Sequence, residues 1–459
     1  MAFLSRNPHT GATLRKVVAS PRNVIEESIK RLDGKFVSMK AAGLTERHSQ
    51  LDLMQSVFKD QHNQIAERIS QESGKSLWLA KSEVQMVINY FQWFKENLAD
   101  ITKPTIIPNS ELTAGNVIKQ GYYLKPLGVI YQISPFNFPF LIGMNHTAKN
   151  IAMGNTVMSR PDKGSIHALE YFAPLLAEAG VTAQEFVYSN EDDLDMIMSN
   201  DKIQGVSFTG SSPVGKIVYN AASKYMKKSL VELGGCDPFV VLEDADLDLA
   251  VERAFFWRTF HAGQVCVSPK RMIVSDKLVE EFTNRIVEKS KAIVVGVDPV
   301  THEEAGTGFP PMSRLDLRSK VHDQVNRAVK HGDTLLAGGN EVGETYYEPT
   351  VLRVNSNTSP AWKEEIFGPV FSIRSFKDET EALAMANDTE WGLSGSVYSK
   401  DMDRALSFAN QIDSGLVHVN DTVHTDDPVL QFGGNKKSGI GRNNFKYFTS
   451  EQSFLVHQE

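Results

Sequence analysis

The sequence predicts an α/β protein with largely parallel sheets, and three observations lead to this fold class. From residue 128 onward, short apolar runs alternate with helical stretches, beginning with GVIYQI, TVMSR, EFVYS and IQGVSFTG. Strands that alternate with helices of about 10–15 residues are typical of parallel sheets with crossover helices. The 459 residues suffice for two or three domains, since a domain holds roughly 100–200 residues. No Pro- or Ser-rich linker separates the regions, so we expect closely packed domains with a cleft between them.

The elements follow one another in a clear order. Residues 45–98 are expected to be helical, because apolar residues recur at helical spacing with a break near Gly74. Residues 116–126 fit a short extended ribbon. SIHALEYFAPLLAEAG and PVGKIVYNAASKYM then fit crossover helices. A second α/β region follows Gly235, with the strands FVVL, RMIV, EPTVLRV, VFSIRSF and GLVHVN and the helix DLDLAVERAFFWRTF.

The composition argues against several classes of protein. The 48 Lys and Arg are outnumbered by 56 Asp and Glu, which gives a net charge of −8 without any basic run. We therefore expect no general attraction for nucleic acid or for an anionic membrane surface. The N-terminal MAFLSRNPHTG lacks a signal-peptide pattern, and no apolar stretch approaches the roughly 18–20 residues that span a bilayer. Two cysteines form no disulfide framework, so a soluble cytoplasmic protein is expected.

Cys266, in FHAGQVCVSPKR, lies just past the end of a predicted helix. A cysteine in an accessible, activating environment can act as a nucleophile, whereas a buried one is inert. Most isolated cysteines are small core residues, and no histidine stands at a spacing that demands a Cys–His pair, although His261 is near. Metal-binding patterns such as HExxH and paired CxxC are absent, so no metal site is expected.

Polar residues and glycines at predicted strand ends provide further candidates. Glu232 ends an apolar run before Gly-Gly and could be a general base or a solvated strand-end residue. Asn137, in ISPFNFPF, could donate to an oxyanion or form a turn. The GxGxxG fingerprint is absent, but Gly210 and Gly215 stand at a strand-to-helix turn. Glycines there either let the backbone approach a phosphate or serve only the turn.

Taken together, the motifs resemble those of the aldehyde dehydrogenase superfamily over essentially the whole chain. The matching strings occur in the family's order: NPHTG, ISPFNFP, VSFTGSSPVG, ELGGCDPF, GQVCVSPKR, EEIFGPV, NDTEWGLSGSVYS and FGGNKKSGIGR. ELGGCDPFVVL and PMSRLDLRSKVHDQV are most similar to the short succinate-semialdehyde dehydrogenase-like group. The resemblance implies a Rossmann-like cofactor domain at 1–115 and 127–233 and a catalytic α/β domain at 234–430. It also implies an oligomerisation β-ribbon at 116–126 and 440–459, and hence a homodimer or homotetramer.

The resemblance also implies roles for individual residues. Cys266 would attack the aldehyde carbon, while the Asn137 amide and the Cys266 N–H hold the oxyanion. Hydride would pass to the nicotinamide, and Glu232 would activate the water that releases the acid. The residues expected to bind the cofactor are Phe136 (in place of the usual Trp), Asn137, Arg160, Lys163, Gly210, Ser211, Gly215, Leu233, Glu365 and Phe367.

The stretch VMSRPDKGS departs from the family at the adenosine side of the cofactor site. Arg160 stands where the family usually has Lys, and Lys163 where NAD-specific members often have Glu. Two cations favour the extra phosphate of NADP. Asp162 lies between them and weakens this inference, and Lys163 could instead point into solvent. NADP is therefore favoured, and NAD stays open.

The substrate is less well defined. Close relatives carry arginines suited to a substrate carboxylate where this chain has Asn145 and Pro428. Four other residues are candidates to replace them: His146, Arg258, His261 and His424. A semialdehyde with a carboxylate, such as succinate semialdehyde, or a neutral aliphatic or aromatic aldehyde would each fit the reaction.

Two further interpretations were weighed. Coenzyme-A-acylating or phosphorylating relatives typically lack the water-activating Glu, so Glu232 argues against them. A non-catalytic member kept for binding is disfavoured because Cys266, Asn137 and Glu232 are all present. Cys236 is interpreted as a small buried residue rather than a redox partner of Cys266.

Overall fold

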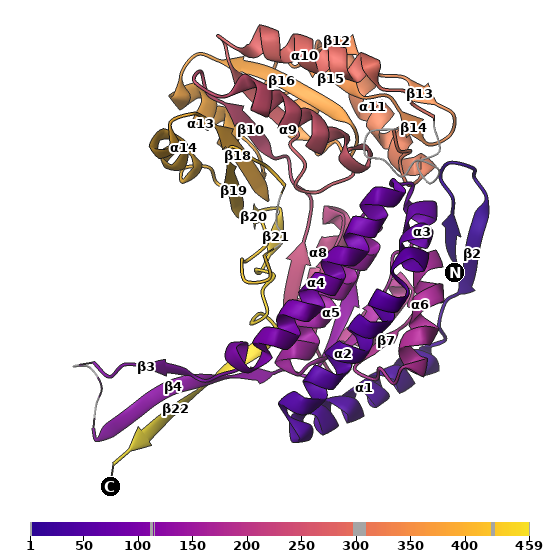
Figure 1. Ribbon diagram of the computed structural model, residues 1–459, viewed down its shortest axis with the longest axis vertical. Helices are drawn as coiled ribbons and strands as arrows, with labels where there is room; N and C mark the ends of the chain where they lie inside the picture. Colours follow the sequence, from indigo (N-terminus) through magenta and orange to yellow (C-terminus); the bar gives the residue numbers. More distant parts are fainter. Residues whose placement is uncertain (1, 111–112, 114, 297–308, 424–426, 459) are drawn as a thin grey trace.

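The fold consists of two α/β lobes and a projecting ribbon (Figure 1). The computed structural model describes residues 2–110, 113, 115–296, 309–423 and 427–458. One lobe contains a six-stranded sheet and the other a seven-stranded sheet. The α/β prediction is confirmed. Among the described residues, no helix is both long and apolar enough to cross a bilayer.

The N-terminal part covers the six-stranded sheet with helices. It contains the hairpin β1 (Ala2–Arg6) and β2 (Thr13–Val18) and the helices α1 (Arg22–Ala42), α2 (Leu44–Asp60), α3 (His62–Ser73) and α4 (Leu77–Ile101). The break predicted near Gly74 is confirmed, because Gly74 ends α3 with φ +78°. A Cβ there would meet side chains of Pro8 and Pro311 at 2.8 Å, so only glycine fits.

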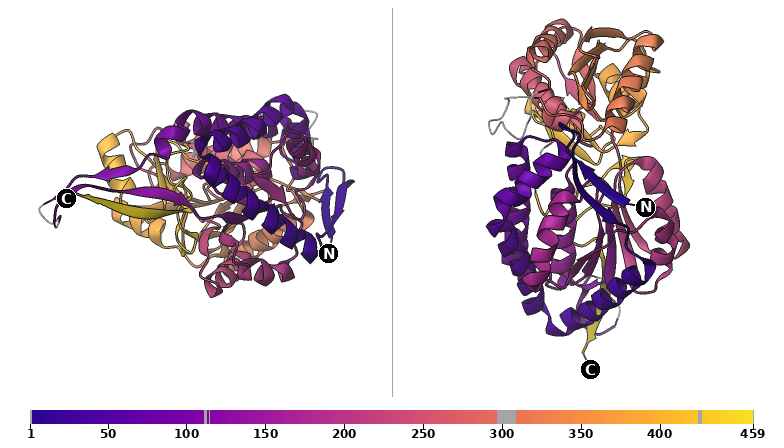
Figure 2. Two further views of the ribbon diagram at one scale, coloured as in Figure 1. Left: turned by 90° about the horizontal axis from the view of Figure 1, so that it is seen from below. Right: turned by 90° about the vertical axis from the view of Figure 1, so that its right-hand side faces the viewer.

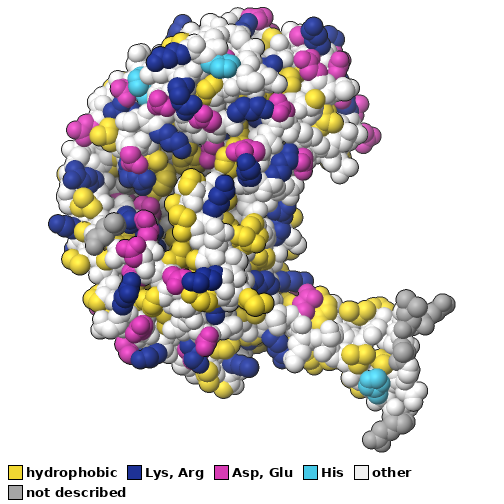
Figure 3. Space-filling model, turned by 180° about the vertical axis from the view of Figure 1, so that it is seen from behind, with side chains coloured by type: hydrophobic (Ala, Val, Ile, Leu, Met, Phe, Trp, Pro, Cys, Tyr) yellow, Lys and Arg dark blue, Asp and Glu magenta, His cyan; other side chains and the backbone are white. Residues whose placement is uncertain are grey.

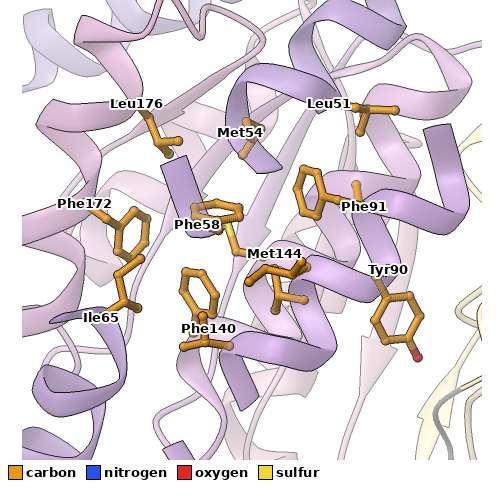
Figure 4. Packing of buried hydrophobic residues seen from close by; sticks show 14 of the residues in the cluster. Leu51, Met54, Phe58, Ile65, Tyr90, Phe91, Phe140, Met144, Phe172 and Leu176 are labelled. Atoms are coloured by element: carbon orange, nitrogen blue, oxygen red, sulfur yellow. The ribbon is translucent and has the colours of Figure 1, made fainter. Parts of the chain in front are cut away.

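Aromatic rings fill the space between these helices (Figure 4). Phe58 lies edge-to-face with Phe91, Phe140 and Phe172, at centroid distances of 5.5, 5.0 and 6.0 Å. Such pairs add roughly 0.5–1.5 kcal/mol each to the burial of their area. Because Phe140 belongs to the helix that follows Asn137, this packing fixes one side of the candidate site.

The six-stranded sheet has the order β21-β9-β8-β5-β6-β7, and all its strands are parallel except β21. Its strands are β5 (Val129–Ile133), β6 (Thr156–Arg160), β7 (Gln184–Phe186), β8 (Ile203–Thr209), β9 (Lys228–Glu232) and β21 (Gly439–Ile440). The intervening helices are α5 (Pro139–Met153), α6 (His167–Glu178), η1 (Glu191–Asp193), α7 (Leu194–Ser199) and α8 (Ser212–Lys224). The carboxyl ends of the parallel strands therefore meet at one edge, where such sheets bind ligands.

The seven-stranded sheet has the order β12-β15-β16-β11-β10-β18-β19, with only β12 antiparallel. Its strands are β10 (Pro238–Val241), β11 (Arg271–Ser275), β12 (Thr334–Ala337), β15 (Thr350–Arg353), β16 (Val370–Phe376), β18 (Ser394–Tyr398) and β19 (Leu416–Val419). Its helices are α9 (Leu247–Thr259), η2 (Phe260–Gly263), α10 (Val279–Ala292), α11 (Leu315–His331), α12 (Pro360–Lys363), α13 (Glu379–Asn387) and α14 (Met402–Ala409). Short strands complete the lobe: β13 (Glu341–Val342), β14 (Tyr346–Tyr347), β17 (Trp391–Gly392) and β20 (Asn435–Lys436).

The ribbon extends away from both lobes (Figures 1 and 2). It pairs β22 (Thr449–His457) with β4 (Val117–Pro126), and β3 (Thr105–Ile107) lies on the other side of β4. The C-terminal ribbon strand begins at Thr449 rather than at 440, because Gly439–Ile440 pairs with β9 in the six-stranded sheet. The domain boundaries stay a prediction.

Candidate active site

The three candidate catalytic residues come from three separate loops or strand ends. Asn137 lies between β5 and α5, Glu232 is the last residue of β9, and Cys266 lies between η2 and β11. The Asn137 side-chain amide donates to the carbonyl of Gln264, 3.0 Å away and two residues before the cysteine. Glu232 is near enough to raise the pKa of Cys266 through its charge. The fold thus brings all three together where the lobes meet.

The loop before Cys266 has an unusual backbone. His261, Ala262 and Gly263 all have positive φ values, of 49°, 52° and 72°. A Cβ on Gly263 would lie 2.3 Å from the carbonyl oxygen of Gly368, so glycine is required there. Non-glycine residues in this conformation cost about 1–3 kcal/mol each and cluster at functional sites. The surrounding structure must therefore hold this loop in place.

A buried lysine secures the loop from the other side. The Lys270 ammonium donates to the carbonyls of Val265, Cys266 and Ser268, at 3.3, 2.5 and 3.1 Å. Lys270 is 2% exposed and faces Glu365 at 3.8 Å. Three carbonyls gathered on one cation fix the turn that presents the cysteine.

The surroundings of Cys266 are apolar. The half-buried Cys266 packs against a cluster that contains Trp257, Val265, Val267, Leu393, Val423, Phe138, Phe260 and Phe432. Burial raises the pKa of the Cys266 thiol to about 12, while the positive charge of Lys270 acts in the opposite direction. The thiolate is the nucleophilic form, so the thiol must lose its proton as it reacts.

Glu232 has a buried carboxyl group that neighbouring described residues do not hydrogen-bond. It is 4% exposed, and neither carboxyl oxygen has a hydrogen-bond partner among the described residues. Burial raises its pKa well above the usual value, although the charges of Arg442 and Lys149 oppose the shift. A buried carboxyl group with a raised pKa is, once ionised, a stronger base than an ordinary glutamate, so Glu232 is suited to accept a proton.

Of the two glycines predicted for the cofactor, Gly210 lies at the β8–α8 turn, whereas Gly215 lies in the first turn of α8. Ser211 occupies the N-cap position of α8, and Gly210 donates its N–H to the Glu232 carbonyl at 3.0 Å. A Cβ on Gly215 would meet the Leu233 side chain at 2.4 Å, so glycine lets α8 pack on the end of β9. The N-terminus of α8 thus lies at the sheet edge, which fits a phosphate-binding role.

The second lobe contributes Glu365 and Phe367 from the loop before β16. The rings of Phe367 and Phe136 are 6.0 Å apart, edge-to-face. Glu365 accepts a hydrogen bond from the Gly235 N–H at 3.2 Å. These contacts bring residues of the two lobes next to one another, as a dinucleotide that contacts both lobes would require.

The segment that the sequence predicts for the adenosine end of the cofactor has more charges around it than its own residues supply. Arg160 ends β6 and donates to the Ser189 carbonyl at 3.2 Å. The Lys163 ammonium is 2.8 Å from Glu191, and Asp162 is 3.4 Å from Arg314. Glu191 and Arg314 were missed because they lie far from VMSRPDKGS in the sequence, where no local pattern links them to it.

The candidates for binding a substrate carboxylate are poorly suited to it. Arg258 is fully buried and donates to the carbonyls of Val370 and Ile366 and to the Ser268 hydroxyl. Burial lowers the pKa of His146 to about 3 and that of His261 well below its usual value, so both are neutral.

Among the described residues, the other positions considered for binding a substrate carboxylate contribute no positive charge. Asn145 lies on α5, and Pro428 is half-buried. His424 lies outside the described residues.

Cys236 lies in the core rather than in the site. It is 2% exposed, and its Sγ faces the carbonyls of Trp362 and Glu364 at 3.7 and 3.6 Å. Burial raises the pKa of its thiol. Across the part of the chain that the structure describes, no group of three or more His, Cys, Asp or Glu side chains is arranged to hold a metal ion.

Comparison with known proteins identifies the class to which this fold and site belong. The sequence model of the aldehyde dehydrogenase family matches residues 2–454. The chain belongs to the aldehyde dehydrogenase family.

Several individual proteins are similar over nearly their whole length. The succinate semialdehyde dehydrogenase [NAD(P)+] Sad of Escherichia coli is 33% identical over 445 residues, which cover 96% of this chain and 94% of that protein. The benzaldehyde dehydrogenase YfmT of Bacillus subtilis is 31% identical over 98% and 92% of the two chains. The structure of succinic semialdehyde dehydrogenase from Streptococcus pyogenes in complex with NADP+ superposes with a TM-score of 0.93, at 28% identity, over 99% of this chain and all of that one.

Proposed function

We propose that this protein oxidises an aldehyde to its carboxylic acid with a nicotinamide dinucleotide, through a covalent intermediate on Cys266. The observation that carries the proposal is the convergence of Cys266, Asn137 and Glu232 between the two lobes. A nucleophile, an oxyanion donor and a base are the groups that aldehyde oxidation through a thioester requires.

The proposed reaction begins at the thiol. Cys266 gives its thiol proton to solvent, its sulfur bonds to the aldehyde carbon as the C=O π bond opens, and the resulting oxyanion accepts hydrogen bonds from the Asn137 amide and the Cys266 N–H. An amide carries two N–H donors, so Asn137 can keep its bond to Gln264 while the second donor serves the oxyanion. Glu365 and Phe367 would help to hold a nicotinamide dinucleotide here, and that cofactor would supply the acceptor for the hydride of the aldehyde carbon. Glu232 then takes a proton from water, which attacks the thioester carbon and releases the acid and the thiol.

The residues at the sheet edge fit the cofactor. The α8 N-terminus at Ser211 would hold the pyrophosphate, while Glu365 and Phe367 would lie toward the nicotinamide side. Arg160, Lys163 and Arg314 supply positive charge for the extra phosphate of NADP, although Glu191 competes for Lys163. The name of the Deinococcus radiodurans relative, an NADP(+) succinate-semialdehyde dehydrogenase, supports the same preference. NADP is the favoured cofactor and NAD the alternative.

Two substrate classes follow from different observations. The names of relatives from Escherichia coli, Deinococcus radiodurans and Saccharomyces cerevisiae support succinate semialdehyde. The apolar cluster around Cys266 and the neutral state of His146 and His261 favour an uncharged aliphatic or aromatic aldehyde. Hydrophobic side chains also gather in the hollow where the two lobes meet (Figure 3).

The ribbon supports a homo-oligomer, dimer or tetramer. It exposes several large apolar side chains, namely Ile106, Ile107, Ile118, Leu455 and Val456, and Figure 3 shows hydrophobic side chains along the projecting ribbon. Exposed apolar patches and open strand edges are typical of association surfaces. Both cysteines are free thiols, which fits the reducing cytoplasm that the composition predicts.

Initial rates of reduced-nicotinamide formation test the proposal. Succinate semialdehyde, benzaldehyde and a short aliphatic aldehyde would each be assayed with NADP and with NAD. We expect oxidation of at least one aldehyde, with a fall of at least about 10³-fold in Cys266→Ser. Cys236→Ser is the matched control and keeps the parental rate. Absence of oxidation with every pair, or full activity in Cys266→Ser, would refute the proposal.

A further inference from the structure

A buried ion pair lies directly behind the Asn137 segment. Lys75 stands in the short connection between α3 and α4, and Glu83 lies on α4. Both side chains are fully buried, and the ammonium contacts the carboxylate directly. Burying two charges costs more than their attraction returns unless further hydrogen bonds are made, so such a pair by itself says little for stability. The role of the Lys75–Glu83 pair must therefore be inferred from the other groups that it contacts.

Among the described residues, the further side-chain hydrogen bonds of this pair go to the chain around Asn137. The Lys75 ammonium donates to the Asn137 carbonyl at 2.7 Å and lies 4.1 Å from the centre of the Phe138 ring. One Glu83 oxygen accepts the backbone N–H groups of Phe140 and Leu141, at 3.0 and 2.9 Å.

These contacts hold both ends of one turn. Pro139 is the first residue of α5 and has no N–H, so the N–H groups of Phe140 and Leu141 are the first two at the helix start. The lysine fixes the peptide that follows Asn137, and the glutamate fixes the beginning of α5.

We propose that the Lys75–Glu83 pair is a positioning device for the Asn137 amide, an inference that rests on the proposed function. Within the part of the chain that the structure describes, the side-chain amide donates one hydrogen bond, to the Gln264 carbonyl on the opposite lobe. An oxyanion donor must lie within hydrogen-bond distance of an atom that becomes charged only in the transition state. A fixed carbonyl and a fixed helix start restrict the backbone from which that amide projects.

The chain offers a matched control for this device. Glu72, also buried, accepts the N–H groups of His167 and Ala168 at the start of α6, at 2.7 and 3.4 Å, and the Ser5 hydroxyl at 3.1 Å. It therefore supports a helix start in the same way as Glu83 does. The helix α6, however, carries none of the proposed catalytic residues. Among the described residues Glu72 hydrogen-bonds neither Lys75 nor Glu83 and acts on them only through its charge, so Glu72→Gln reports the cost of weakening such a support without breaking the pair's own contacts.

The test compares Lys75→Met and Glu83→Gln with Glu72→Gln in the full-length protein. Because a misplacement of about 1 Å can cost about 100-fold in rate, we expect kcat to fall roughly ten- to a hundredfold in the first two variants. The KM for the aldehyde and the Kd for NADP should change less than about threefold, since neither residue touches a ligand. Glu72→Gln should keep kcat within about twofold of the parent.

Alkylation of Cys266 by iodoacetamide separates a specific effect on the Asn137 amide from a general structural defect, because only the general defect would change the alkylation rate. Displacement of iodide forms no oxyanion. In Lys75→Met, Cys266 should therefore be alkylated at the parental rate although aldehyde turnover is slow. A further measurement uses Asn137→Ala: if Lys75 acts through Asn137, then Lys75→Met should cost less than about threefold in that background.

Several results would overturn the inference. Parental kcat in Lys75→Met, or the same fall with and without the Asn137 amide, would show that the pair does not act through this residue. Should Lys75→Met fail to fold, Lys75→Met/Glu83→Met removes both charges and leaves no unpaired one. That double variant must then show the same selective loss of kcat. Absence of aldehyde oxidation in the parent would instead contradict the proposed function itself.

Discussion

Replacing Arg258 with methionine distinguishes a structural role for this arginine from a role in binding a substrate carboxylate. Arg258 is fully buried on α9, and its guanidinium donates to the carbonyls of Val370 and Ile366 at 2.7 and 2.6 Å and to the Ser268 hydroxyl at 2.9 Å. It thereby ties the helix to the start of β16 and to the Cys266 loop. Methionine has a similar length but no donor, so all three acceptors would lose this partner.

The contacts set the size of the effect. A hydrogen bond to a charged group contributes about 1.5–3 kcal/mol, so three of them correspond to roughly 4.5–9 kcal/mol. Burial of the guanidinium opposes this gain, as the lowering of the pKa of Arg258 to about 10 indicates. We therefore expect Arg258→Met to lower the free energy of unfolding by about 3–5 kcal/mol, the range for breaking a buried polar cluster.

Denaturant unfolding measures this change, and Arg253→Met is the control. Arg253 lies on the same helix, but its side chain is 40% exposed and its ion pair with Asp421, at 3.3 Å, is peripheral. Its loss should cost less than about 1 kcal/mol. In both variants the ratio of kcat/KM for succinate semialdehyde to that for benzaldehyde should stay at the parental value. Parental stability in Arg258→Met, together with a selective loss for the semialdehyde, would refute the reasoning.

Three other variants test the site. Glu232→Gln should lower the steady-state rate by about 10²–10⁴-fold while a burst of one reduced nicotinamide per site remains; a burst lost in equal measure would contradict a role confined to water activation. Because burial raises the pKa of Glu232, the parental kcat should rise with pH through a value above that of an ordinary glutamate, as the base forms. Lys163→Glu should shift the NADP/NAD ratio of kcat/KM toward NAD by about tenfold or more, which corresponds to ~1.4 kcal/mol. An unchanged ratio would show that Lys163 does not contact the extra phosphate. Lys270→Met removes a charge that lowers the pKa of Cys266, so the pH profile of alkylation should move to higher pH; a shift to lower pH would contradict this electrostatic role.

Much of the fold could be predicted because strands and crossover helices leave local patterns. The runs TVMSR and VFSIRSF correspond residue for residue to β6 and β16. The long helical stretch was harder, since 45–98 divides into three helices and only the division at Gly74 has a local signal. The boundary between α2 and α3 is a single turn at Gln61, and the helical periodicity continues across it.

The strand-end candidates were accessible from sequence for a related reason. In a parallel sheet the carboxyl ends lie at one edge, so residues after β5, β6, β8 and β9 must approach one another. Contacts between segments that are far apart in the sequence leave no such local pattern. Lys75 and Asn137 are 62 residues apart in the chain. The neutral state of His146 likewise follows from burial, which the sequence alone does not reveal.

The distribution of hydrogen bonds in the site suggests how such a centre can react. The supporting cations are saturated: Lys270 holds three carbonyls, and Lys75 holds a carboxylate, a carbonyl and an aromatic face. The reacting groups differ, because neither oxygen of Glu232 has a hydrogen-bond partner among the described residues and Cys266 lies among apolar side chains. An unpartnered buried carboxyl group loses stability as it ionises. Accepting a proton removes this cost, so burial strengthens ionised Glu232 as a base, whereas formation of the Cys266 thiolate is opposed by burial and favoured by the charge of Lys270.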